Sequence, residues 1–121
     1  MGNPVVHFEI MGKNSKTLTG FYRDAFGWDI GEPVGPQEYA LIDADPGRER
    51  GIRGGIGTSP DGYDGGATFY IGVPDIKEAL KTVAKFGGNT MMEPREAPGG
   101  IIIGYFRDPE GHPIGLVQIP N

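Results

Sequence analysis

The residues best suited to chemistry are His7 and Glu9, which are two positions apart in the stretch VVHFEIM. Apolar side chains alternate with them at Val6, Phe8 and Ile10, a pattern typical of a half-buried strand. Because successive side chains of a strand point to opposite faces, His7 and Glu9 share one face about 7 Å apart. Such a pair could handle a proton or orient a ligand, and the two are our candidates for catalysis. The alternative is that His7 bonds to a neighbouring strand and Glu9 is solvated.

Four further side chains could line a small-molecule pocket with aromatic walls and hydroxyl groups: Trp28, Thr68, Tyr70 and Tyr105. Ordinary packing in the core or at its rim is the alternative for each of them. The chain has no cysteine, which excludes a thiolate nucleophile and a thiolate metal site. No nucleophile–base arrangement and no phosphate-binding loop is visible.

The elements that must position these residues occur twice in the same order. After the first strand, helical spacing relates Leu18, Phe21, Tyr22, Ala25 and Phe26, and Gly27 ends the helix. Three strand candidates follow, in WDIGEPV, QEYALIDA and GIRGGIGT.

The second half repeats the plan after the loop SPDGYDGG at residues 59 to 66. A strand in ATFYIGV leads to a helix that Asp75 caps with Glu78, and strand candidates follow in NTMMEPREA, GIIIGYF and PIGLVQI. We therefore predict one α+β domain over residues 1–121, built from two βαβββ modules at residues 4–60 and 66–119.

The net charge and the length of the apolar runs limit the kinds of binding partner that we expect. The net charge of −5 argues against a nucleic-acid-binding protein, which usually carries a basic patch. No apolar run approaches the ~20 residues that a membrane helix needs, and no signal peptide is visible. We expect a cytoplasmic protein whose partner is a small molecule, with no nucleic acid and no membrane.

Four stretches together resemble the vicinal oxygen chelate superfamily: VVHFEI, FYRDAFGW, FYIGVPDIKEAL and FRDPEGHPIGLVQ. This superfamily includes glyoxalase I, extradiol ring-cleaving dioxygenases, fosfomycin-resistance thiol transferases and bleomycin-binding resistance proteins. The resemblance covers nearly the whole chain. It implies that the two modules form an open eight-stranded cup, with the ligand inside and the helices outside. It also implies pairing of modules within a chain or between chains, from which we expect a homodimer.

The resemblance also implies where a metal ion would bind. In metal-using members the ligands come from the first and last strands of each module, and His7 matches the first of these positions. The other positions carry Gly55 or Gly57, Thr68 or Tyr70, and Gly115, where the family's glutamate would fall. A catalytic divalent ion generally needs about three protein ligands. We therefore expect no metal and no other cofactor, with a divalent ion as the alternative, and we expect a glutamate introduced at position 115 to face His7.

Two functions from different classes stay open. The first is a glyoxalase/bleomycin-resistance-like protein that binds an apolar or aromatic molecule in a mostly metal-free cup, where the acidic charge would suit a cationic ligand. The second is a metal-dependent lyase or isomerase, or a dioxygenase, of the glyoxalase type, with His7 as metal ligand or general base. The sequence leaves open whether the protein is an enzyme.

Overall fold

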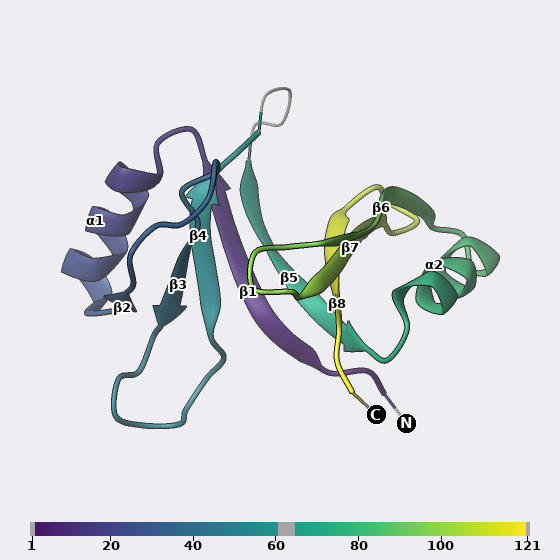
Figure 1. Ribbon diagram of the computed structural model, residues 1–121, viewed down its shortest axis with the longest axis horizontal. Helices are drawn as coiled ribbons and strands as arrows, with labels where there is room; N and C mark the ends of the chain where they lie inside the picture. Colours follow the sequence, from purple (N-terminus) through teal and green to yellow (C-terminus); the bar gives the residue numbers. More distant parts are fainter. Residues whose placement is uncertain (1, 61–64, 121) are drawn as a thin grey trace. The chain divides into compact units, whose positions relative to one another are not determined.

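The computed structural model describes residues 2–60 and 65–120. The chain folds as two compact units, one of residues 7–67 and one of residues 1–6 with 68–121. We call them the N-terminal and the C-terminal module. Each contains strands on one side and a single helix on the other (Figure 1).

The N-terminal module places its strands in the order β2-β3-β4-β1. Its elements are β1 (Val5–Gly12), α1 (Ser15–Phe26), β2 (Asp29–Ile30), β3 (Ala40–Asp43) and β4 (Gly54–Thr58). Strand β4 runs parallel to β1 and antiparallel to β3. The side chain of Asn14 accepts a hydrogen bond from the backbone of Thr17 to begin α1, and left-handed Gly27 ends it. The end of α1 at Gly27 agrees with the sequence pattern.

The core of this module lies between α1 and the sheet. Its buried residues are Ile30, Ala40, Ile42 and Ile56, with Phe8, Ile10, Leu18, Tyr22, Trp28 and Ala44 packed against them. On β1 the core therefore takes the even-numbered side chains, and the odd-numbered ones lie on the opposite face of the sheet.

The C-terminal module places its strands in the order β5-β8-β7-β6. Its elements are β5 (Gly66–Val73), α2 (Ile76–Lys85), β6 (Asn89–Glu96), β7 (Ile102–Arg107) and β8 (Pro113–Gln118). Helix α2 packs against the sheet (Figure 1) through a core of Val73, Ile76, Leu80 and Leu116. The side chain of Asp75 accepts a hydrogen bond from the backbone of Glu78, as the capping pattern predicts.

The predicted α+β class with two βαβββ modules is confirmed, with eight strands in open sheets and two helices. Strands β2, β3 and β4 are shorter than the sequence suggests, and β2 has only two residues. Part of the predicted 59–66 loop lies outside the described residues. Neither described helix is long and apolar enough to cross a membrane.

The prediction that one apolar face of α1 is buried is wrong for three of its five residues. Leu18 and Tyr22 pack on the core, but Phe21 is 56% exposed and Ala25 and Phe26 are also exposed. The short β2 leaves little sheet for the helix to cover, so only a narrow stripe of α1 is buried. Phe21 instead contacts the rings of Tyr22 and Phe26 on the outside of the helix.

Substitution of Gly20 by alanine is expected to raise the free energy of unfolding by about 0.5–1 kcal/mol, because glycine in a helix is less favourable than alanine. Gly20 lies inside α1, and a β-carbon built there meets no atom within 4 Å. Urea denaturation of both proteins measures the difference. A loss of stability would show that this part of α1 packs more closely than described.

Candidate functional site

The face of the N-terminal sheet that lies away from α1 carries both predicted catalytic candidates. His7 and Glu9 alternate with the core residues Phe8 and Ile10 on β1. Gly55 is the register partner of Glu9 on β4, so it lies on the same face. Glu9 is only 5% exposed, which argues against the alternative of a fully solvated carboxylate.

A tyrosine that the sequence analysis did not single out bonds to His7. The hydroxyl oxygen of Tyr39 lies 2.8 Å from Nε2 of His7, and either group can donate, depending on the imidazole tautomer. The two rings are nearly parallel, at an interplanar angle of 25°. His7 is therefore bonded by a side chain from outside the regular strands.

Gly55 provides the space that the Tyr39 ring occupies. A β-carbon built on Gly55 would lie 2.1 Å from Cζ and Oη of Tyr39, far closer than two carbon atoms can approach. The absence of a side chain at Gly55 is thus a condition for the His7–Tyr39 hydrogen bond.

Burial lowers the pKa of His7 below its ordinary value of 6.5, because the charged imidazolium loses hydration there. The neutral ring is consequently the favoured form of His7 in the folded protein near neutral pH.

The free energy of unfolding is expected to fall on acidification below about pH 6.5. There the unfolded chain takes up a proton at His7, while the folded chain does so only at lower pH. Stability rises with pH wherever the unfolded state binds more protons. The His7 contribution is therefore fully present above the unfolded-state pKa and is lost as the pH falls toward the folded-state pKa.

Denaturation curves at a series of pH values, for the protein and for His7→Gln, isolate this effect. The difference between the two proteins removes the contributions of all other groups. Parallel pH profiles for the two proteins would show that His7 titrates normally in the folded state.

The C-terminal module contains a second tyrosine ring over a strand glycine. Tyr70 on β5 and Tyr105 on β7 are both register partners of Gly115 on β8. The Tyr70 ring covers Gly115, where a built β-carbon would lie 2.6 Å from Cδ2 of Tyr70. The hydroxyl groups of Tyr70 and Tyr105 are hydrogen-bonded to each other. Thr68, on the same face of β5, donates its hydroxyl to the carbonyl of Pro113 at 2.7 Å.

The last predicted binding residue, Trp28, lies in different surroundings. Its ring stacks on Tyr22, with centroids 4.8 Å apart, and meets the edge of Phe8. These contacts are on the α1 side of the N-terminal sheet, away from the face that carries His7. The structure thus groups His7 with Glu9, and Tyr70 with Tyr105 and Thr68, but leaves Trp28 apart.

A comparison with protein families identifies the fold. The family model described as Glyoxalase/Bleomycin resistance protein/Dioxygenase superfamily matches residues 5–116. The chain belongs to this superfamily. The resemblance seen in the sequence is confirmed. A comparison with curated proteins gave no match.

Several solved structures share the fold at low sequence identity. A hypothetical protein from Bacillus halodurans C-125 has a TM-score of 0.72 at 16% identity and covers 100% of this chain and 97% of its own. Methylmalonyl-CoA epimerase from Mycobacterium tuberculosis has a TM-score of 0.70 at 18% identity, with 97% and 87% covered. A methylmalonyl-CoA epimerase in complex with methylmalonyl-CoA and NH4+ has a TM-score of 0.68 at 17% identity, with 96% and 94% covered.

The metal centre used by some members of the glyoxalase superfamily does not fit the residues present here. Among residues 2–60 and 65–120, no three His, Cys, Asp or Glu side chains cluster closely enough to hold a metal ion. Nε2 of His7 is engaged by Tyr39, and Gly55 and Gly115 lie under tyrosine rings. A divalent ion that needs about three protein ligands finds too few donors in these positions.

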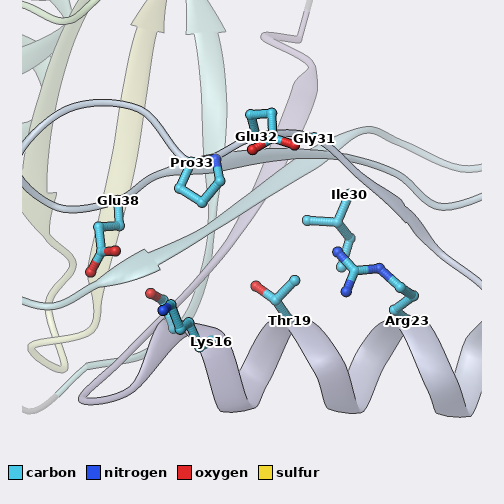
Figure 2. A pocket seen from close by; sticks show the side chains of 9 residues that line it. Lys16, Thr19, Arg23, Ile30, Gly31, Glu32, Pro33 and Glu38 are labelled. Atoms are coloured by element: carbon cyan, nitrogen blue, oxygen red, sulfur yellow. The ribbon is translucent and has the colours of Figure 1, made fainter.

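A polar cleft of about 200 Å³ lies on the helix side of the N-terminal module (Figure 2). Lys16, Thr19 and Arg23 project into it from α1, and Glu32 and Glu38 lie on the facing connection between β2 and β3. None of the residues predicted for the site lines this cleft. Its charged, open character differs from the apolar lining typical of small-molecule pockets.

Proposed function

We propose that this glyoxalase-superfamily protein binds a small organic molecule without a divalent metal ion, on the surface that carries His7, Glu9 and Tyr39. One observation carries the proposal. His7 is the residue that matches a metal-ligand position of the superfamily, and its Nε2 is hydrogen-bonded to the hydroxyl of Tyr39. Polar recognition would then come from hydroxyl, imidazole and carboxylate groups in place of a metal ion. Tyr70, Tyr105 and Thr68 stay predicted ligand-binding residues of the C-terminal module.

Apolar contact with the ligand would come from the same face. Leu41 on β3 is the register partner of Gly55 and therefore lies on the His7 face, where it is 65% exposed. Together with the Tyr39 ring it offers an apolar surface beside the buried carboxylate of Glu9. The net charge of −5 favours a cationic ligand over an anionic one by long-range attraction. A cationic aromatic compound fits these features best.

The metal-dependent alternative, a lyase, isomerase or dioxygenase of the glyoxalase type, is not favoured. Such chemistry uses the metal ion as a Lewis acid, and the described side chains do not supply a ligand set for one. The epimerase neighbours support a small-molecule ligand for this fold, since one of them is bound to methylmalonyl-CoA.

A thermal-shift screen tests the proposal, because a ligand that binds only the folded state raises the melting temperature. The protein is first dialysed against a chelator. The probes are bleomycin, a set of cationic and neutral aromatic compounds, and methylmalonyl-CoA as an anionic comparison. We expect cationic aromatic compounds to raise the melting temperature of the metal-free protein. A response to none of the probes, or only after a divalent ion is added, would contradict the proposal.

A pair of variants locates the binding surface. Leu41→Lys places a positive charge on the His7 face, whereas Ile52→Lys makes the same change at an exposed residue of the loop before β4. We expect the ligand-induced shift to shrink in Leu41→Lys and to persist in Ile52→Lys. Equal responses in the two variants would place the ligand elsewhere.

We also infer that the protein is a cytoplasmic homodimer. The superfamily pairs its modules within or between chains, and exposed strand edges favour association of a second copy. Sedimentation at micromolar concentration is expected to give twice the chain mass of 13.0 kDa. A mass near that of one chain would exclude the dimer.

A further inference from the structure

The turn between β2 and β3 places the Tyr39 hydroxyl beside His7. Val34 and Tyr39 form an isolated antiparallel bridge, in which the backbone N–H of each donates to the carbonyl of the other at 3.0 and 2.9 Å. Tyr39 is thus the last residue of a closed turn and immediately precedes β3. These two backbone hydrogen bonds fix the backbone position of Tyr39.

The turn adopts a backbone conformation that is unfavourable for its sequence. Glu38 has a φ of +51°, and it is the only residue other than glycine with a positive φ in the described part of the chain. An L-residue with a side chain rarely adopts this conformation, and such strain persists only where the surroundings enforce it. Here the backbone N–H of Thr58 on β4 donates to the carbonyl of Gln37 at 2.7 Å, which ties the turn to the sheet.

Strand β4 leaves space for the Tyr39 ring of this turn. Both residues that share the His7 face on β4, Gly55 and Gly57, lack side chains, and a β-carbon on either would come within 3.0 Å of the Tyr39 ring. A β-carbon on Gly57 would also lie 3.2 Å from the carbonyl oxygen of Gln37. The strained turn, its bond to β4 and the two glycines therefore all favour the same placement of the Tyr39 ring.

We propose that Tyr39 is the positioning residue of the ligand site, which fixes the ring orientation of His7 through Nε2. The Tyr39 hydroxyl can donate to Nε2 or accept from it, so the hydrogen bond holds the ring in either tautomer of the neutral imidazole. The ligand would therefore meet a His7 ring whose orientation is set before binding. The site would select a molecule whose polar group meets the ring in that one orientation. This inference rests on the proposed function, in which His7 contacts the ligand.

The ¹⁵N signals of the His7 ring in the ligand-free protein test the inference, because they report the tautomer and the hydrogen bond at each nitrogen. In Tyr39→Phe the ring over Gly55 is kept and only the hydroxyl is removed. We expect the Nε2 signal of His7 to move, because Nε2 loses its hydrogen-bond partner. Tyr22→Phe, which removes a hydroxyl on the α1 side of the same module, should leave the His7 signals unchanged. Unchanged His7 signals in Tyr39→Phe would overturn the inference.

A second pair of variants tests the turn and does not require Tyr39 to be altered. Glu38→Gly allows the positive φ and should keep the His7 signals of the parent with an equal or higher melting temperature. Glu38→Val disfavours that φ and should reproduce the His7 signals of Tyr39→Phe. Parent-like signals in Glu38→Val would show that the turn does not position His7. A failed ligand screen would instead count against the proposed function, since these spectra are recorded without ligand.

Discussion

Gly115→Glu is expected to lower the free energy of unfolding by ~3–5 kcal/mol, the sum of overpacking and of burying a carboxylate. The first carbon of the new side chain would lie 2.6 Å from Cδ2 of Tyr70. Tyr70 is only 5% exposed and its hydroxyl is bonded to Tyr105, so its ring has little freedom to move away. Urea denaturation measures the loss.

Two control variants separate the causes of this loss. Gly115→Ala retains the steric conflict without the charge and should cost ~1–3 kcal/mol. The double variant Gly115→Ala with Tyr70→Ala should lose less free energy of unfolding than the sum of the two single variants. The alanine at position 115 conflicts with the Tyr70 ring, and this conflict is absent when the ring is removed. Additive effects would show that Tyr70 does not occupy the space above Gly115. Gly20→Ala, the same substitution where there is room, should be stabilising.

The Tyr70 ring over Gly115 also changes the effect that a metal ion is expected to have on the melting temperature of Gly115→Glu. The sequence led us to expect that this variant would restore a carboxylate facing His7. Because the Tyr70 ring covers Gly115, a carboxylate can enter only by displacing that ring. Added zinc or nickel is therefore expected to leave the melting temperature of Gly115→Glu where it was. A metal-dependent rise larger than that of the parent would show that Gly115 is an open ligand position.

Ile56→Ala is expected to lower the free energy of unfolding by ~2–5 kcal/mol, the usual range for truncating a fully buried aliphatic side chain. Ile56 has no exposed surface and lies at the centre of the N-terminal core. Phe21→Ala, which the helical pattern of α1 would place among the costly changes, should cost only about 1 kcal/mol or less, the level of an exposed side chain with a few ring contacts. Chemical denaturation of both variants ranks them.

The reverse order, with Phe21→Ala more damaging than Ile56→Ala, would mean that α1 packs with its other face on a partner. The homodimer that we infer offers such a partner, so the two variants are best compared over a range of protein concentrations. A cost for Phe21→Ala that grows with concentration would place Phe21 in the contact between subunits.

Local chemistry made most of the fold predictable. Gly27 and Asp75 mark helix ends through interactions with their own neighbours, so the sequence alone locates them. The family resemblance implied Gly55 or Gly57 at a metal position, and both lie on the His7 face of the N-terminal sheet. The extent of α1 that is buried was not predictable, because the exposure of Phe21 depends on the length of β2, a property of another element.

The candidate site was predictable only in part, for a related reason. His7 and Glu9 could be found from their spacing on one strand. Tyr39 could not, because its place beside His7 depends on a positive φ at Glu38 that no pattern of residue types demands. The signal that could have indicated Tyr39 is the pair Gly55 and Gly57. Two missing side chains on one face of a strand indicate that something else fills the space, and at Gly115 that something is likewise a tyrosine ring.

The central claim, that His7 is held by Tyr39 and not by a metal ion, is tested most directly by titrating the chelator-dialysed protein with zinc while the ¹⁵N signals of the His7 ring are recorded. An imidazole nitrogen that binds a metal must give up its hydrogen-bond partner, so coordination would change the Nε2 signal. We predict that the His7 signals stay at their starting positions after one zinc ion per chain has been added. Saturating movement of the Nε2 signal at one equivalent of zinc would contradict the account.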